Sequence, residues 1–267
     1  MKKFLSIFRI SFQQEFAYKL NFVMWRIRNV MQILVFFFLW NAVFENRTGD
    51  LLGYNKEKIL TYAFMLLVIR AITLSSRSVD VSGQISRGEL SNFLVKPVNF
   101  FKYWITRDLS SKFLNIIFSL LEITLLLIFL KPNLFFQTSF LYVVFFIISI
   151  IVAIIIFFAI SMIISFIPFW FPEIAWGSQF LFIVVVTEFL SGSFFPLDVL
   201  PMGVYKILKI TPFPYLVFVP IKIYLGNLNY QEILVSLGIG TIWCFILLII
   251  MKRIWLKGLK VYEAVGR

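Results

Sequence analysis

The chain has 267 residues, of which 61% are hydrophobic and 14% are charged, and its formal net charge is +12. A soluble domain is roughly 45–50% apolar, so this composition excludes a soluble globular protein and indicates a chain surrounded by lipid. Histidine is absent and there is one cysteine, which excludes a His-based catalytic triad, a His/Cys metal site and an internal disulfide. The basic residues flank apolar segments, which favours membrane topology over nucleic-acid binding.

The first 20 residues carry apolar side chains at helical spacing, interrupted by charged and amide residues. One face of such a helix would hold Leu5, Phe8, Phe12, Phe16 and Leu20. We expect an amphipathic helix over residues 1–20 that lies on the membrane surface. The alternative is that these residues form the frayed start of the first membrane span.

Six apolar segments could cross a bilayer, which takes about 20 helical residues. They are Asn21–Phe44, Ile59–Leu74, Phe113–Leu130, Phe140–Phe166, Ser178–Phe195 and Ile233–Met251. With the N-terminus in the cytoplasm, 17 of the 25 Lys and Arg residues fall on inner segments and seven on outer ones. This bias follows the positive-inside rule. It predicts an even number of spans with both termini inside, and therefore six spans rather than five.

Residues 75–112 form the longest polar segment between two predicted spans. It contains a short amphipathic stretch, Glu89–Lys96, which ends at Pro97. A short helix with an apolar face needs a surface to pack against. The residues alone leave two interpretations open: the stretch binds a partner, or it lies on its own membrane surface.

Four of the prolines that follow the fifth span interrupt any long helix, because each removes a backbone donor: Pro196, Pro201, Pro212 and Pro214. Residues 191–226 are too apolar for a free loop and too interrupted for a span. In lipid, irregular backbone is tolerated only where it is buried in protein or lines a cavity. We expect a re-entrant pair of short helices at the outer face, and the alternative is a long, partly ordered outer loop.

Two carboxylates lie inside predicted spans, Glu122 and Glu188, with Glu188 towards the outer end of its span. A charge at the bilayer centre costs roughly 2.5–3.5 kcal/mol on insertion scales. Each carboxylate therefore either lines a transport pathway or bonds to another helix. Arg26 and Arg28, at the start of the first span, are expected to extend towards the interface.

The sequence contains no G-x-x-x-x-G-K-[ST] phosphate loop and no nucleophile or metal motif near these carboxylates. We therefore expect no enzymatic activity, no catalytic residue and no metal site on this chain. ATP-driven transport would need a motor on another polypeptide. The two halves show no internal repeat, which weakens the case for an inverted-repeat secondary transporter.

Two segments resemble the permease subunit of bacterial type-2 ABC exporters, in the compact subfamily of about this chain's length. GELSNFLVKPVNFFKY (Gly88–Tyr103) resembles the cytoplasmic coupling-helix segment of that family. FLSGSFFPLDVLP (Phe189–Pro201) and TPFPYLVFVPIKIYLG (Thr211–Gly226) resemble its outer segment. In topology the resemblance covers residues 1–267, as one transmembrane domain.

The resemblance implies an all-α polytopic protein of the bacterial cytoplasmic membrane, with six spans, a surface helix, a coupling helix and a re-entrant segment. Two permease subunits, identical or a related pair, would form the path. Two cytosolic ATPase subunits, which carry ATP and Mg, would drive it, and this chain would hold no cofactor. The ATPase contact would comprise Arg87, Gly88, Glu89, Leu90, Phe93, Leu94 and Pro97. The outer gate would comprise Ser191, Gly192, Phe195, Pro196, Leu197 and Pro201.

Two other functions compete with this interpretation. An ion-gradient-driven secondary transporter would use Glu122 and Glu188 as proton sites. A non-transporting membrane scaffold is the other alternative.

For the exporter interpretation, the expected partners are ATPase subunits, a second permease and membrane lipid, and no nucleic acid is expected. Neither the residues nor the resemblance names a substrate.

Overall fold

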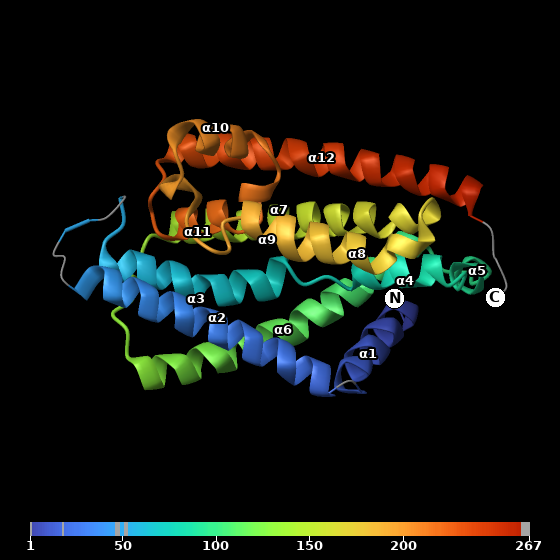
Figure 1. Cartoon of the computed structure of the whole chain (residues 1–267), viewed down its shortest axis with the longest axis horizontal. Coiled ribbons are helices and arrows are strands. Elements are labelled where there is room, and N and C mark those ends of the chain that lie inside the picture. The colour runs from blue at the N-terminus through green and yellow to red at the C-terminus, as the bar shows by residue number, and fades with distance from the viewer. Residues whose placement is uncertain (1, 18, 46–48, 51–52, 263–267) are drawn as a thin grey trace.

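The computed structural model describes residues 2–17, 19–45, 49–50 and 53–262, and its regular elements are helices (Figure 1). The long helices are α1 (Lys2–Ala17), α2 (Lys19–Glu45), α3 (Lys56–Thr73), α6 (Phe100–Leu130), α7 (Phe140–Ser165) and α12 (Tyr230–Val261). Between α3 and α6 lie η1 (Arg77–Val79), α4 (Asp80–Ser86) and α5 (Leu90–Leu94). Between α7 and α12 lie η2 (Ile167–Phe169), η3 (Pro172–Ile174), α8 (Ala175–Gln179), η4 (Phe180–Thr187), α9 (Glu188–Leu190), η5 (Leu197–Val199), α10 (Met202–Ile210), η6 (Phe213–Tyr215) and α11 (Phe218–Tyr224).

The number of membrane spans agrees with the sequence prediction. Within the described ranges, five straight helical stretches are long and apolar enough to cross a membrane: Arg26–Glu45, Phe100–Leu130, Phe140–Phe169, Pro172–Leu190 and Tyr230–Val261. A sixth is a bent pair, Lys56–Thr73 with Arg77–Ser86, whose parts meet at 47°. The chain is therefore an integral membrane protein with six spans when the bent pair counts as one.

Helix α7 is the central helix of the bundle. In its most apolar window 39% of residues are buried, against 17–28% for the other straight spans. It packs against α12, α11 and α3. The other spans leave most of their apolar residues on the outside, where lipid or a second subunit can cover them.

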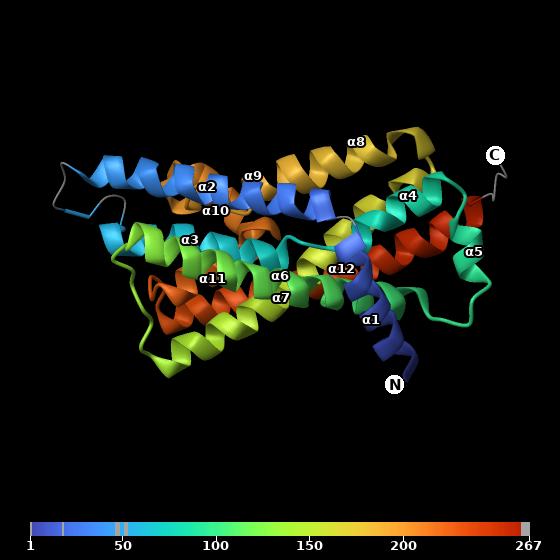
Figure 2. The same ribbon diagram turned by 90° about the horizontal axis from the view of Figure 1, so that it is seen from below.

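The two ends of the bundle differ in what they hold. Figures 1 and 2 show α4, α5 and the last turns of α12 at one end. The last turn of α2 and the start of α3, together with α10 and α11, lie towards the other end. We call these the inner and outer ends, following the charge bias of the sequence.

Helix α1 lies at an angle to the bundle and packs on α6, where Ser110 donates a hydrogen bond to the Phe8 carbonyl (3.0 Å). Whether α1 lies on a membrane surface stays a prediction.

Helix α6 begins at Phe100, more than three turns before the predicted start at Phe113. Asn99 caps it, because its side chain accepts a hydrogen bond from the Lys102 amide (3.0 Å). Residues 100–112 were expected to belong to the polar segment 75–112 that separates two spans. Several of those polar side chains instead point into the protein, and Asp108 is only 2% exposed.

Gly258 gives a stability prediction on α12. Its α-carbon faces Phe169, and an added Cβ would overlap that ring, which belongs to an aromatic cluster where Trp255 stacks on Phe100 (centroids 3.9 Å apart). We expect Gly258→Ala to destabilise the fold by about 1–3 kcal/mol, measured by thermal unfolding in detergent. Gly238→Ala on the same helix is the control, since nothing lies within 4 Å of its added Cβ. Equal melting temperatures for the two variants would contradict this packing.

Candidate functional site

The outer segment, residues 191–226, begins with a tight turn at Gly192. This glycine has a φ of +86°, and its carbonyl accepts a buried hydrogen bond from the Tyr62 hydroxyl of α3 (2.7 Å). The Phe218 amide of α11 donates to the Ser191 carbonyl (3.0 Å). A Cβ at Gly192 would lie 3.0 Å from both Tyr62 Oη and Phe218 Cβ. The turn therefore requires glycine, and it ties α3, α9 and α11 together.

The remaining predicted gate residues divide by burial. Ser191 and Leu197 are buried beside the glycine turn, and Pro196 is buried with them. Phe195 is half-buried and packs edge-on against Phe189 of α9 (centroids 5.8 Å apart). Pro201 is exposed at the start of α10. The turn itself thus holds Ser191, Gly192 and Leu197, whereas Pro201 lies away from it.

Asp198 is a second fixed point of the outer segment, and the sequence analysis did not identify it. Its carboxylate accepts a hydrogen bond from the Tyr54 hydroxyl (3.1 Å) and forms an ion pair with Lys222 of α11 (2.9 Å). Burial, with the Asp198 carboxylate adding to it, raises the pKa of Tyr54 well above its ordinary value of 10.0. Tyr54 therefore stays a protonated donor at neutral pH. The sequence did hold a signal for this role, because Asp198 is the one acidic residue in the Pro-rich apolar segment 191–226.

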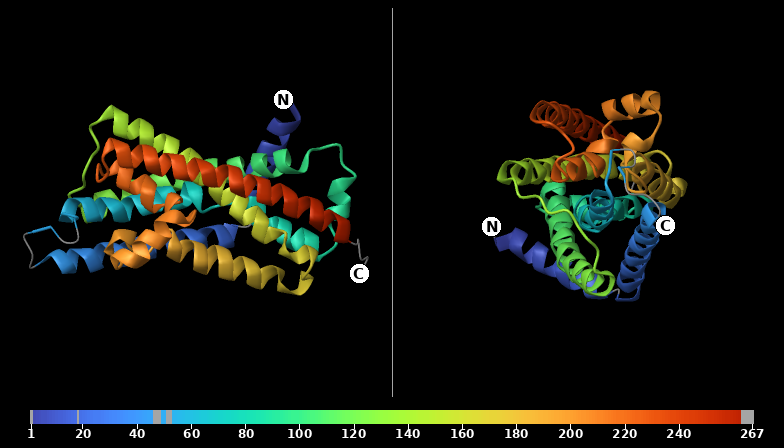
Figure 3. Two further views of the ribbon diagram at one scale, coloured as in Figure 1. Left: turned by 90° about the horizontal axis from the view of Figure 1, so that it is seen from above. Right: turned by 90° about the vertical axis from the view of Figure 1, so that its left-hand side faces the viewer.

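Neither helix of the outer segment is long enough to cross a membrane. Helices α10 and α11 have nine and seven residues. At about 1.5 Å per residue they extend about 14 and 11 Å, whereas the hydrocarbon core is about 30 Å thick. Figure 3 shows them beside the outer half of α12, and α11 packs on α7. The predicted pair of short helices is present.

Glu122 on α6 forms an ion pair with Arg26 of α2. The guanidinium Nη1 lies 3.4 Å from Glu122 Oε2, and the same guanidinium bonds to Asn115. Both charged side chains are about one-tenth exposed. Arg26 is thus held by a carboxylate on a neighbouring helix, and whether it also reaches the membrane interface stays a prediction.

Glu188 on α9 lies between two arginines. Its Oε2 is 2.7 Å from Arg70 Nη2 on α3 and 3.5 Å from Arg28 Nη2 on α2. Its partner Arg70 lies in the last turn of α3, and Glu188 itself lies near the C-terminal end of the candidate span Pro172–Leu190. A π-helical stretch, η4, directly precedes Glu188, and such stretches are frequent at functional sites. Pathway lining by Glu122 or Glu188 stays a prediction.

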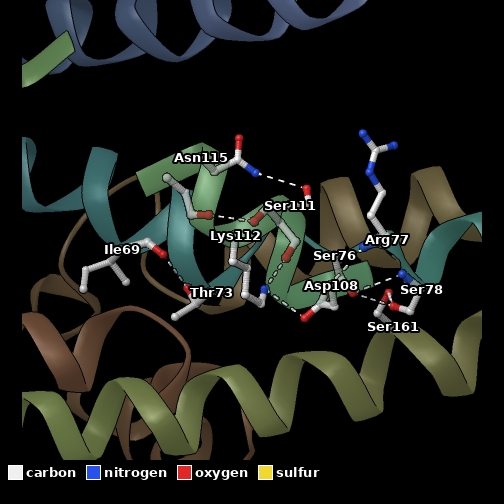
Figure 4. Close-up of polar contacts among 12 residues, drawn as sticks. Ile69, Thr73, Ser76, Arg77, Ser78, Asp108, Ser111, Lys112, Asn115 and Ser161 are labelled. Carbon is white, nitrogen blue, oxygen red and sulfur yellow. Dashed lines mark hydrogen bonds and ion pairs between the residues drawn. The ribbon is translucent and has the colours of Figure 1, made fainter. Parts of the chain in front are cut away.

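A buried polar cluster supports the bend between α3 and η1 (Figure 4). The Lys112 ammonium of α6 donates to the Ser75 carbonyl within the bend and pairs with Asp108 one turn earlier (3.4 Å). Asp108 also accepts from the Arg77 amide (3.2 Å). Lys112 and Asp108 are 3% and 2% exposed. The backbone groups freed by the bend are thus satisfied by charged side chains from α6.

Serine hydroxyls extend this cluster onto α7. Ser78 of η1 donates to Ser161 (2.6 Å), and Ser165 donates to the Ser78 carbonyl (2.8 Å). Gln179 of α8 donates to Ser165 (2.9 Å). We call η1, α4 and α5 (residues 77–94) the inner segment, and three spans therefore meet it at one hydrogen-bonded junction. The apolar pattern of α7 gave no sign of it.

Part of the predicted ATPase contact faces inwards. Leu90 is fully buried, and Phe93 is 8% exposed and packs against Phe100 of α6 (centroids 5.5 Å apart). The Ser91 amide donates to the Tyr262 hydroxyl beyond α12 (3.2 Å). Leu90 and Phe93 are therefore core residues that hold α5 in place, and they are removed from the surface that a partner could touch.

The accessible side of this loop is formed by other residues. Val95 is 85% exposed and Leu94 is 45% exposed. The exposed side chains around them belong to Arg87, Glu89 and Pro97. Gly88, with a φ of +72°, makes the turn into α5. Arg87 donates to Glu89 (2.8 Å) and holds the pKa of that carboxyl below its ordinary value.

Comparison with known protein families identifies the chain. The ABC-2 family transporter protein matches residues 30–266, which is nearly the whole sequence. No match was found among curated proteins. The matched range includes most of the first span, the other five spans in full, and the inner and outer segments described above. The chain therefore belongs to the ABC-2 family of transporter proteins.

Proposed function

We propose that this chain is the permease subunit of an ATP-driven exporter in the bacterial cytoplasmic membrane, with both termini in the cytoplasm. It would form the translocation path with a second permease, identical or related. Separate cytosolic ATPase subunits would bind ATP and Mg. The observation that carries this proposal is the membership of the ABC-2 transporter family, joined to six spans.

Two continuous routes connect the inner segment to the outer turn, which supports a mechanical role. One route is α3, which leads from the bend at residues 74–76 to the bond between Tyr62 and Gly192. The other is the run of α8, η4 and α9, which leads directly into Ser191. Helix α4 packs on α8, and Ser82 donates to the Ala175 carbonyl (3.1 Å). Pressure on the inner segment would reach the outer turn by both routes.

We place the ATPase contact on Leu94 and Val95, with Arg87 and Glu89 at its edge. An apolar side chain that is 85% exposed at the inner end of the bundle gains free energy when a partner covers it. The burial of Leu90 and Phe93 fixes the orientation of this surface. The contact therefore acts as a rigid part of the bundle.

Val95→Asp tests this contact. We expect it to weaken association with the ATPase subunit by about tenfold or more, because it places a charge at the centre of an apolar contact. The melting temperature should not change, since the side chain is exposed. Co-purification and ATP-dependent transport in proteoliposomes give the readout. Phe93→Leu is the control from the same helix and should preserve association, because Phe93 points inwards. Normal ATPase binding by Val95→Asp would contradict the contact.

A secondary transporter is disfavoured by the arginines. Each intramembrane carboxylate is already paired, Glu122 with Arg26 and Glu188 with Arg70. A proton would have to displace a guanidinium before it could bind. Transport by the isolated chain under a proton gradient, without ATPase subunits, would overturn the ATP-driven proposal.

A further inference from the structure

Helix α12 is longer than the membrane core is thick, and its inner end extends beyond that core. The stretch Ile233–Met251 carries no charged residue and is bounded by Glu232 and Lys252. At about 1.5 Å per residue it extends about 28 Å, which is close to the thickness of the hydrocarbon core, about 30 Å. The helix continues to Val261. Residues 252–261 therefore lie at the level of the inner headgroups and beyond it.

One side of the inner half of α12 faces away from the bundle. The opposite side packs on α7 and on the aromatic cluster around Trp255, so α12 lies at the edge of the protein (Figures 1 and 3). Exposed side chains recur on the free side every three or four residues and form one stripe. Its apolar members are between 40% and 58% exposed, and its basic members are exposed and follow them towards the inner end. We call this set the α12 stripe: Ile242, Ile246, Ile249, Arg253, Lys257 and Lys260.

The basic residues of the α12 stripe form no ion pair with the described part of the chain. Other acidic side chains at the inner end have basic partners of their own, since Asp80 lies 3.6 Å from Arg107 and Glu89 lies 2.8 Å from Arg87. Glu173 of the neighbouring η3 is exposed and pairs with none of the three. Three cations within about 10 Å along one helix therefore present their charge outwards. An anionic ligand would complement them.

Aromatic side chains mark the same level of the membrane, independently of the length of α12. Phe169 of η2 lies directly against Gly258 of α12. Trp170 follows Phe169, and Trp176 of α8 comes one short turn later, with 40% and 77% of their surface exposed. Tryptophan is enriched where the membrane meets water. The two tryptophans therefore support placing residues 253–258 among the headgroups.

The order of side chains along the α12 stripe matches that of a phospholipid. Ile246 and Ile249 lie within the charge-free stretch, and Arg253 and Lys257 follow one and two turns later. A guanidinium and an ammonium bind phosphate through charge-assisted hydrogen bonds. The inner leaflet holds anionic lipids whose chains and headgroups are stacked in this same order. An acidic protein segment could reach only the part beyond the membrane and would leave the isoleucines uncovered.

We propose that the α12 stripe binds an anionic phospholipid of the inner leaflet, with the phosphate at Arg253 and Lys257 and an acyl chain along Ile246 and Ile249. Lys260 lies farther from the core and adds attraction at longer range. This binding goes beyond the proposed function, because it requires neither an ATPase subunit nor an exported substrate.

Photolabelling of the purified full-length chain tests the site. The protein is placed in nanodiscs of phosphatidylcholine that contain a small fraction of phosphatidylglycerol with a diazirine in one acyl chain. Phosphatidylcholine with the same diazirine, at the same fraction, is the comparison probe. We expect phosphatidylglycerol to label peptides of residues 242–261 about tenfold more, because it carries a net negative charge, and high salt should reduce this preference. Equal labelling of these peptides by the two probes would overturn the proposal.

Two double variants separate the site from the general positive charge of the inner end. Arg253→Gln with Lys257→Gln removes both phosphate contacts and should reduce the preference to about twofold or less. Both side chains are exposed, so the melting temperature should not change. Lys96→Gln with Lys102→Gln is the matched control, since it removes the same charge from exposed inner positions outside α12, and it should keep the preference. Equal loss in both variants would refute the site, because the whole inner end would then attract the lipid.

A further arm shows whether lipid or protein covers the α12 stripe. The labelling is repeated on the chain after ATPase subunits have bound to it. We expect the label on residues 242–261 to persist, since the stripe faces the membrane. Loss of this label on assembly would show that a protein covers the face, and lipid would be rejected as its occupant. If no ATPase subunit associates with the chain, the proposed function fails, whereas the preference for phosphatidylglycerol still supports the lipid site.

Discussion

Replacing Lys112 by methionine is expected to destabilise the folded chain by about 3–5 kcal/mol, because it leaves the buried Asp108 carboxylate without its ion pair. The same change removes the donor that satisfies the Ser75 carbonyl in the bend between α3 and η1. Loss of both interactions should allow α4 to move relative to α3. We expect a large fall in the melting temperature in detergent and a loss of transport.

Two further variants show whether this effect comes from the pair. Lys252→Met makes the same chemical change at an exposed position of α12 and should leave the melting temperature nearly unchanged. The double variant Lys112→Met with Asp108→Asn removes both charges and keeps an acceptor for the Arg77 amide. It should recover much of the lost stability, since an uncharged buried cluster pays no desolvation cost for ions. A double variant as unstable as the single one would show that the ion pair is not the cause.

Gly192→Ala is the second change with a large expected effect. The alanine would have to adopt a left-handed backbone at a cost of about 1–2 kcal/mol, and its Cβ would press on Tyr62 and Phe218 at 3.0 Å. Crowding of this kind adds about 1–3 kcal/mol. We expect the turn to shift, the bond from Tyr62 to break, and transport to fall even where the protein still inserts. Thermal unfolding and transport assays on the same preparation measure both effects.

Gly53→Ala is the control for the backbone part of this effect. Gly53 has a φ of +81°, almost the same as Gly192, but nothing lies within 4 Å of its added Cβ. The variant should therefore show the backbone cost alone and retain transport. If Gly53→Ala and Gly192→Ala behaved alike, contact with Tyr62 and Phe218 would not be what makes Gly192 necessary.

The sequence predicted the spans well because apolar length is a property of each helix by itself. It also predicted the short helices of residues 191–226, since proline acts on the local backbone, whereas Gly192 was named only through the family resemblance. It failed at polar residues whose partners are distant along the chain. The pairing of Lys112 with Asp108 and of Arg26 with Glu122 was not predicted, although both basic side chains are largely buried.

The same limit explains the misplaced part of the ATPase contact. The sequence showed that Leu90, Phe93 and Leu94 are apolar, and apolar side chains on a short helix can face a partner or their own protein. Phe100 and Tyr262 decide this choice, because they cover Phe93 and fix Ser91. Such contacts between α5 and the ends of two spans have no local signature.

Three cross-links at successive heights join α3–α4 to α8–α9 and the turn that follows α9. They are the bonds between Tyr62 and Gly192, between Arg70 and Glu188, and between Ser82 and Ala175. These bonds oppose sliding of α3–α4 along α8–α9, because an axial shift would stretch all three of them together. Under the proposed function, a push at α4 would therefore tilt α3 and α8–α9 together and would reach the glycine turn through both.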